Sequence, residues 1–217
     1  MLIEARDIGK SFAGGASPVL RGVSLALGPG ETVALTGESG SGKSTFLHIV
    51  AGLETADSGA LRVCGADPGA LSDAGRAALR RERLGIVFQQ FNLVPSLTAE
   101  ANVAFQARLA GRHDPARVSA LLGRLGLSDA ARKYPEELSG GQQQRVAVAR
   151  ALAAGPSLIL ADEPTGNLDE ATGDAVLEAM LALVREAGAG LLMVTHSERL
   201  AGRLGRRLHL RHGRFSP

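Results

Sequence analysis

Residues 37–45 read Gly37-Glu38-Ser39-Gly40-Ser41-Gly42-Lys43-Ser44-Thr45. This stretch fits the pattern G-x-x-x-x-G-K-[ST], which is typical of a phosphate-binding loop. The apolar run at 32–35 predicts a short buried strand before the loop, and the periodic stretch at 46–50 predicts a helix after it. A strand, a glycine-rich loop and a helix in this order are the context that the motif requires.

The residue types of this loop suit a polyphosphate. Glycines at 37, 40 and 42 can take backbone angles that other residues rarely adopt, so the loop can wrap the phosphates and aim its N–H groups at their oxygens. The N-terminus of the following helix adds partial positive charge. We expect Lys43 to reach the β- and γ-phosphates and Ser44 to hold Mg²⁺. A Gly- and Ser-rich surface turn is the alternative, which the complete motif disfavours.

Length and composition restrict the class of protein. The 217 residues, 45% of them hydrophobic, suffice for one large domain, or a domain with a subdomain, around a packed core. The net charge is only +2 and no long basic tract occurs, so the charge does not indicate nucleic acid. A single cysteine, Cys64, fits a reducing compartment. Without a membrane-spanning apolar run or a signal peptide, we expect a cytoplasmic protein whose membrane role comes through a partner.

Strand and helix signals alternate along the chain. In the first half they predict two or three antiparallel strands within 2–27 with a turn at 14–18, a strand at 60–63, a helix at 72–83 and a strand at 84–88. Residues 98–137 lack strand signals and predict a helical insertion. In the second half we expect a helix at 143–153, a strand at 157–161, a helix at 170–187, a strand at 190–194 and a last edge strand near 206–210. This alternation predicts an α/β fold with a mostly parallel sheet.

Polar residues stand at the ends of three predicted buried strands. Gln89 follows one of them, Asp162 and Glu163 follow the second, and His196 follows the third. Because the carboxyl ends of parallel strands meet at one edge of a sheet, we expect these residues to converge beside the phosphate loop. A carboxylate there is the acidic partner of Mg²⁺, and its neighbour can polarise a water. A lone strand-end histidine is more often structural, but this convergence favours a functional one.

Phe12 is one of only six phenylalanines. An aromatic residue near a nucleotide site can stack on a purine ring, and the alternative is an ordinary core residue. The residue taken alone does not decide between the two interpretations.

In order and context, these motifs resemble the ATP-binding cassette of ABC transporters, and the resemblance covers essentially the whole chain. The most specific part is Leu138-Ser139-Gly140-Gly141-Gln142 together with Leu158-Ile159-Leu160-Ala161-Asp162-Glu163 and the downstream His196. The resemblance implies that two cassettes pack head to tail with two ATP molecules between them. Each ATP then touches the phosphate loop of one copy and the Leu138–Gln142 signature of the other, whose Ser139, Gly140 and Gly141 open a helix and form a second anion site.

The resemblance also implies individual roles. Gln89 matches the loop glutamine that senses Mg²⁺ and the attacking water, and Asp162 matches the Mg²⁺-linked acid. Glu163 matches the catalytic base, and His196 matches the switch histidine at the γ-phosphate. The remaining expected nucleotide contacts are the stacking aromatic Phe12, the loop residues Gly37, Ser39, Gly40, Ser41, Gly42, Lys43, Ser44 and Thr45, the signature residues Ser139, Gly140, Gly141 and Gln142, and Asp169 of the loop that crosses to the partner copy.

The resemblance further implies a single cassette over residues 1–217. Its P-loop NTPase core, with an N-terminal antiparallel β subdomain, takes 1–96 and 138–217, and an α-helical insertion subdomain takes 97–137. The sequence at 89–95, 139–145 and 164–169 is most similar to that of the lipoprotein-releasing, macrolide-exporting and cell-division subfamily. One departure is Ala101 before Asn102, where the family often has Glu, in a stretch that faces the membrane partner in relatives.

We therefore expect a Mg²⁺-dependent ATPase subunit that dimerises on ATP and drives a separate integral membrane permease at the inner face of the cell membrane. Lipoprotein release or efflux by mechanotransmission is the leading function. Transmembrane signalling in cell division without transport is one alternative, and a soluble cassette of DNA repair or translation is another. The second cassette, coiled coils and zinc insertions usual in the soluble class do not occur here, so no nucleic-acid partner is expected. The permease selects the substrate, which this sequence does not reveal.

Overall fold

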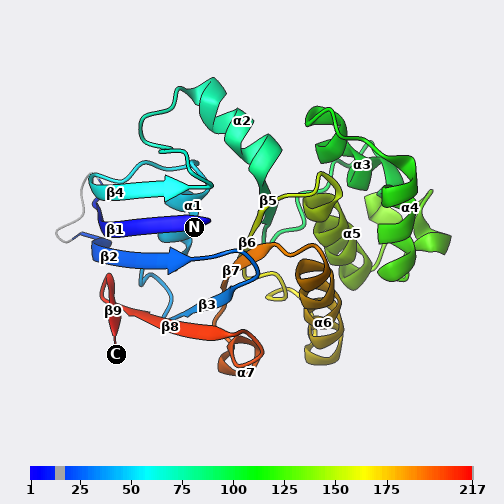
Figure 1. Ribbon diagram of the computed structural model, residues 1–217. Helices are drawn as coiled ribbons and strands as arrows, with labels where there is room; N and C mark the ends of the chain where they lie inside the picture. Colours follow the sequence, from blue (N-terminus) through cyan, green and yellow to red (C-terminus); the bar gives the residue numbers. More distant parts are fainter. Residues whose placement is uncertain (13–17, 217) are drawn as a thin grey trace.

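The computed structural model describes residues 1–12 and 18–216, which form two sheets (Figure 1). The smaller sheet is antiparallel with the order β2-β1-β4, where β1 is Ile3–Lys10, β2 is Leu20–Leu27 and β4 is Ser58–Val63. This sheet confirms the antiparallel strands predicted near the N-terminus. The strand predicted at 60–63 belongs to the same sheet as β4. The turn predicted at 14–18 lies outside the described residues, apart from Pro18.

The larger sheet has the order β5-β6-β7-β3-β8-β9. Its strands are β3 at Thr32–Thr36, β5 at Leu84–Val87, β6 at Leu158–Asp162, β7 at Gly190–Val194, β8 at Arg206–Arg211 and β9 at Arg214–Ser216. All neighbouring strands pair in parallel except β8 and β9. This sheet, with helices connecting its strands, confirms the predicted α/β fold class.

The prediction of a last edge strand near 206–210 was wrong about the edge. β8 lies inside the sheet between β3 and β9, and β9 forms the edge. Arg211 pairs with Arg214 across a two-residue loop, His212-Gly213, in which both residues have positive φ (49° and 75°). Such a loop joins the strands of a tight hairpin. The sequence signal for this hairpin was His212, a residue type tolerated at positive φ, followed by Gly213.

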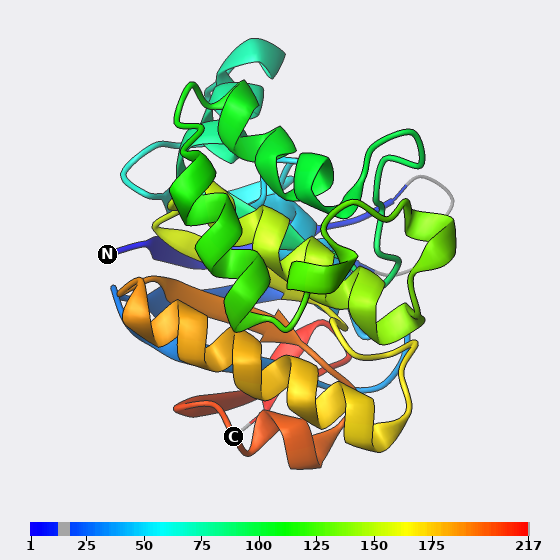
Figure 2. The ribbon, with the colours of Figure 1, turned by 90° about the vertical axis from the view of Figure 1, so that its right-hand side faces the viewer.

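The helices lie mainly on one side of the molecule. They are α1 (Lys43–Val50), α2 (Asp73–Arg83), α3 (Ala99–Leu109), α4 (Pro115–Arg124), α5 (Gly140–Ala153), α6 (Glu170–Glu186) and the short α7 (Glu198–Ala201), with 3-10 turns η1 (Ser128–Ala130) and η2 (Pro135–Glu137). Figure 2 faces this side and shows α3 to α6 as a layer in front of the sheets. α5 packs against α3, α4, α6 and β5, so it connects the helical insertion to the larger sheet.

The helix expected from Gln143 begins three residues earlier, at Gly140. Ser139 caps it by accepting the N–H of Gln142, and the Gln142 side chain accepts the N–H of Ser139 in return. This reciprocal capping box satisfies two backbone donors that a helix end otherwise leaves free, and it draws the two glycines into the first turn. The short α7 was missed, although Ser197 caps it in a similar way by accepting the N–H of Leu200.

Two clusters of buried side chains form the core. One lies around α1, between the antiparallel sheet and the larger sheet, and includes Phe46, Leu47 and Ile8. Phe46 is fully buried and packs edge-on against Phe215 of β9, with ring centroids 6.2 Å apart. The second cluster joins α3 to α6 with β6 and β7. The phosphate loop thus stands at the start of a helix whose other face is fully packed.

The segment after β5 is fixed by one buried side chain, Asn102 of α3. Its Oδ1 accepts the N–H of Val94 at 2.8 Å, and its Nδ2 donates to the carbonyls of Val94, Leu97 and Thr98 at 2.9–3.1 Å. Asn102 has no exposed surface, so these bonds satisfy an amide that would otherwise be costly to bury. The chain following Gln89 is therefore tied to the helical insertion.

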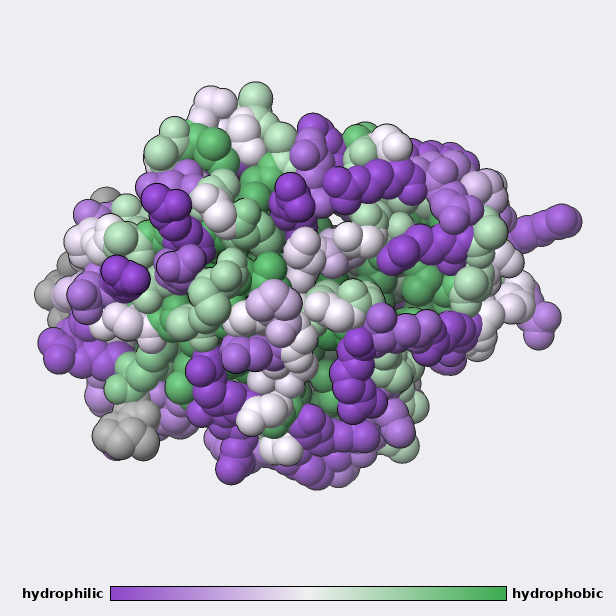
Figure 3. Space-filling view, in the orientation of Figure 1, coloured by the Kyte–Doolittle hydropathy of each residue, from purple (hydrophilic) through white to green (hydrophobic). Residues whose placement is uncertain are grey.

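A groove of about 480 Å³ opens between α2 and α3. Its lining includes three exposed hydrophobic side chains, Leu53, Phe105 and Leu109, and the arginines Arg80 and Arg81. Figure 3 shows this face as mixed, with hydrophilic side chains around the outline, hydrophobic ones between them and a hollow between the two helices. An apolar hollow with a charged border is a feature of surfaces that bind a partner.

Candidate functional site

The phosphate loop has the backbone that the motif requires. Gly37, Gly40 and Gly42 have φ of 143°, 77° and 105°. A Cβ at Gly37 would lie 2.2 Å from the carbonyl oxygen of Leu210, so only glycine fits there. Within 1–12 and 18–216, no side chain caps α1, whose N-cap is Gly42, so the first N–H groups of this helix stay available to a ligand.

The polar groups of Ser41 and Lys43 indicate which kind of ligand the loop suits. The Ser41 Oγ is buried and has no hydrogen-bond partner among the residues that the structure describes, although a buried hydroxyl normally has one. The Lys43 ammonium donates to the carbonyls of Gly37 and Glu38, both at 2.8 Å, and only 4% of the residue is exposed. Burial lowers the pKa of Lys43, and the nearby carboxylates of Glu163 and Asp162 oppose that shift. An orphaned hydroxyl, free N–H groups and a desolvated cation together fit a bound polyphosphate.

Asp162 and Ser44 meet at the end of β6. The Ser44 hydroxyl donates to Asp162 Oδ1 at 3.1 Å, and His48 Nε2 lies 3.9 Å from Asp162 Oδ2. Among the described residues, no group of three or more His, Cys, Asp or Glu side chains surrounds a metal position. One carboxylate and one hydroxyl beside a phosphate loop fit Mg²⁺, which takes few protein ligands and fills its shell with water and phosphate oxygens.

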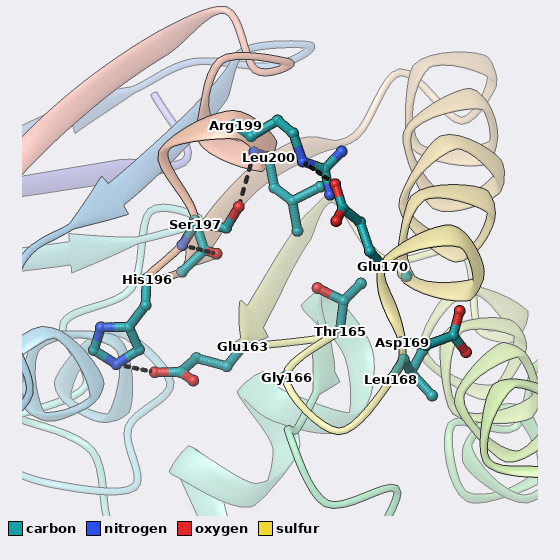
Figure 4. A pocket seen from close by; sticks show the side chains of 12 residues that line it. Glu163, Thr165, Gly166, Leu168, Asp169, Glu170, His196, Ser197, Arg199 and Leu200 are labelled. Atoms are coloured by element: carbon teal, nitrogen blue, oxygen red, sulfur yellow. Dashed lines mark hydrogen bonds and ion pairs between the residues drawn. The ribbon is translucent and has the colours of Figure 1, made fainter.

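Glu163 and His196 lie within hydrogen-bond distance of each other at the ends of β6 and β7. The His196 Nε2 is 2.6 Å from Glu163 Oε1. Figure 4 shows the two side chains pointing toward each other. Glu163 has a positive φ of 45°, a conformation uncommon outside glycine, and its N–H donates to the carbonyl of Val194. Both residues line a cleft of about 460 Å³ together with Thr165, Asp169 and Arg199. The structure thus holds a carboxylate, aimed by a strained backbone, beside the phosphate loop.

Gln89 is close to Asn167, a residue that the sequence reasoning did not single out. The Asn167 Nδ2 donates to the Gln89 carbonyl at 3.0 Å, and the Gln89 side chain lies 3.5 Å from Asn167 Oδ1. A Cβ at Gly166 would come within 3.0 Å of Gln89 Nε2, so the two loops are in close contact. The strand ends therefore bring Gln89, Asp162, Glu163 and His196 to one edge, as predicted.

Within one chain, the Leu138–Gln142 signature does not lie at the sheet edge where the strand-end residues gather. Among the described residues, no hydrogen bond or ion pair joins 139–142 to the phosphate loop at 37–45, and the Ser139 and Gln142 side chains cap α5. Gly141 instead contacts α6, where a Cβ would lie 2.5 Å from Thr172 Cγ2.

Asp169 and Phe12 are both exposed. Asp169 caps α6 by accepting the N–H of Thr172 at 3.0 Å, and hydrogen bonds from the Thr172 side chain and backbone lower the pKa of Asp169. Phe12 is 45% exposed, which excludes the interpretation as an ordinary core residue. Its stacking role remains an inference from the resemblance.

We expect Gly141→Ala to lower the free energy of unfolding by about 1–3 kcal/mol, because the added methyl overlaps the Thr172 side chain. In Gly141→Ala/Thr172→Ala, the nearest remaining Thr172 atom would be Cβ at 3.9 Å, an ordinary contact. Urea denaturation of both single variants and the double variant should show that the second change restores most of the loss. Simple additivity of the two single effects would contradict the close approach of α5 and α6.

The fold and the site define a nucleotide-binding cassette built around a phosphate loop. A family model described as ABC transporter matches residues 20–166, and the chain belongs to this family. The lipoprotein-releasing system ATP-binding protein LolD of Novosphingobium aromaticivorans is 49% identical over 98% of this chain and 97% of its own length. The LolD protein of Porphyromonas gingivalis is 46% identical over 98% of both chains.

Solved structures agree with this assignment. A dimeric ATP-binding cassette in a post-hydrolysis state, bound to ADP and Pi, superposes with a TM-score of 0.90 at 36% identity over 99% of this chain and 97% of its own. A dimeric bacterial ABC transporter cassette gives 0.89 at 37% identity over the same shares. The chain is thus an ATP-binding protein of the ABC transporter family. None of the helices within 1–12 and 18–216 is both long and apolar enough to cross a membrane.

Proposed function

We propose that the chain is the Mg²⁺-dependent ATPase subunit of a lipoprotein-releasing transporter, bound to a separate integral membrane permease at the inner face of the cell membrane. Two contacts beside the phosphate loop support the ATPase activity: Ser44 bonds to Asp162, and Glu163 contacts His196. The lipoprotein part is supported by the names of the relatives, which match this chain over nearly its whole length.

Each residue of the site has its own role in phosphoryl transfer. Lys43 exchanges its two loop carbonyls for the β- and γ-phosphate oxygens, where its charge offsets the charge that develops. Ser44 and Asp162 would hold Mg²⁺, which would supply further charge neutralisation. Glu163 accepts a proton from the attacking water, and His196 orients the Glu163 carboxylate and faces the γ-phosphate. Positioning and charge account for most of the catalysis, because the protein forms no covalent bond.

A second copy of the chain completes each site in this proposal. Gly140 and Gly141 open the signature helix α5, yet among the described residues 139–142 make no hydrogen bond with 37–45 of the same chain. A head-to-tail pair places each signature on the γ-phosphate held by the other copy, so ATP joins the pair and hydrolysis loosens it. The dimeric state of the two solved cassettes supports this arrangement.

The permease would bind at the groove between α2 and α3. The groove exposes Leu53, Phe105 and Leu109, and it lies on the helix that carries Asn102, in the stretch that faces the membrane partner in relatives. Arg150 of α5 also lines the groove and donates to the carbonyls of Phe91 and Asn92 at 3.0 and 2.6 Å. A partner seated there would act on the segment after Gln89 and on the signature helix together.

Reconstitution tests the proposal. The chain and its permease are placed in lipid vesicles that contain a lipoprotein, and phosphate production and lipoprotein release are measured with ATP in Mg²⁺ or in excess EDTA. We expect both activities in Mg²⁺ and neither in EDTA. Hydrolysis without release would overturn the lipoprotein assignment and favour a signalling role. Absence of hydrolysis in Mg²⁺ would overturn the ATPase itself.

A further inference from the structure

A cluster of charged groups lies at the end of β1, outside the phosphate loop. The Lys10 ammonium is 2.9 Å from Glu54 Oε1 and 3.1 Å from Asp57 Oδ1. Only 8% of Lys10 is exposed, so the two carboxylates compensate a cation that is largely removed from water. The hydrogen bond with Glu54 raises the pKa of Lys10, which stays charged in its buried position.

The same cluster fixes the backbone that leads to Phe12. The second carboxylate oxygen of Asp57 accepts the N–H of Ser11 at 2.7 Å, and the N–H of Asp57 donates to the carbonyl of Gly9 at 2.9 Å. Glu54 and Asp57 belong to the segment between α1 and β4. Residues 9–11 are therefore all held by the segment that follows the helix of the phosphate loop, and Phe12 is the next residue.

Lys10 also contacts the Phe12 ring. Its Nζ lies over the ring, 5.2 Å from the centroid, within the distance of about 6 Å at which a cation and an aromatic face attract each other. Phe12 remains 45% exposed. One side of the aromatic ring is thus supported by a fixed cation, while nearly half of the residue is open to a ligand.

We propose that Lys10, held by Glu54 and Asp57, is a positioning residue that orients Phe12 to stack on the purine base of the nucleotide. The inference rests on the proposed function, since it takes Phe12 as the aromatic that binds the base. Stacking depends on the orientation and spacing of two ring planes, so a ring held in place loses less entropy on binding. Because every base has a π-face, this contact favours nucleotides over bare polyphosphate and does not select adenine over guanine.

The test compares two ligands that differ in the nucleoside, ATP and inorganic tripolyphosphate, by calorimetric titration of the full chain. We expect Lys10→Met to bind ATP about tenfold more weakly, the order of one lost base stack, with affinity for tripolyphosphate within about twofold of wild type. Lys10→Arg keeps a cation for both carboxylates and the ring, so it should restore most of the ATP affinity. Lys133→Met is the matched control, because Lys133 is exposed and forms no ion pair with any residue that the structure describes, so this variant should bind both ligands as wild type does.

Several outcomes would overturn the inference. Unchanged ATP affinity in Lys10→Met would do so, and an equal loss of affinity for both ligands would mean that Lys10 acts only through the fold. If Phe12→Ala loses the preference for ATP and Lys10→Met does not, this inference alone fails. If Phe12→Ala binds ATP as wild type does, the proposed base site itself fails. Should Lys10→Met not fold, Asp57→Asn gives the same comparison, because it weakens the hold on Lys10 with little change in shape.

Discussion

Glu163→Gln should reduce ATP turnover at least about a hundredfold while ATP still binds, since a general base contributes about 10²–10⁴-fold and an amide cannot accept the proton. Glutamine keeps the shape of the side chain, and the Glu163 backbone is fixed by its N–H bond to the Val194 carbonyl. Phosphate release measured beside ATP affinity separates the two effects. An unchanged rate in this variant would contradict the proposed role.

The same variant should accumulate as a dimer in Mg-ATP, because the step that loosens the pair is blocked. Size-exclusion chromatography with and without Mg-ATP measures this. Glu178→Gln is the matched control: Glu178 is exposed on α6 away from the cleft and pairs with Arg203 at 3.6 Å, so its loss should change turnover little. A variant that binds Mg-ATP yet stays monomeric would argue against a shared site.

The site could be predicted from the sequence where the signal is local. The phosphate loop is a contiguous pattern, and the strand ends need only the rule that parallel strands finish at one edge. Gln89, Asp162 and His196 were found in this way, and the structure places them together. The contact between Gln89 and Asn167 was not predictable, because it depends on how two loops 78 positions apart pack.

The fold was predictable to a similar degree. Hydrophobic runs gave each parallel strand within one or two residues, but strand order is a long-range property, and β8 was therefore misplaced at the edge. The helical pattern alone placed the start of α5 at Gln143, because two glycines discourage a helix, whereas the resemblance already placed Ser139, Gly140 and Gly141 at its start. The capping box of Ser139 and Gln142 outweighs the cost of the glycines. The cluster of Lys10, Glu54 and Asp57 joins segments 44 or more residues apart, so no local pattern revealed it.

Gly37→Ala should destabilise the protein by about 2–6 kcal/mol and remove measurable ATP binding. Two costs add: alanine at a φ of 143° is strained by about 1–3 kcal/mol, and overlap in a packed region costs about as much again. The overlap is with backbone, since the new Cβ would lie 2.2 Å from the Leu210 carbonyl oxygen. β8 cannot easily retreat, because it is paired with β3 on one side and β9 on the other.

Alanine variants at two other glycines separate the cost of backbone strain from the cost of atomic overlap. Gly30 and Gly40 have φ of 71° and 77°, and a Cβ at either position would meet no atom of the described part of the chain within 4 Å. Alanine there should cost only the strain, about 1–2 kcal/mol by urea denaturation. Gly40→Ala lies in the phosphate loop and Gly30→Ala does not, so comparing their ATP affinities isolates the effect of loop geometry on binding. If Gly37→Ala is no less stable than these two variants, the close approach of the phosphate loop to β8 is wrong, and with it the reason why position 37 requires glycine.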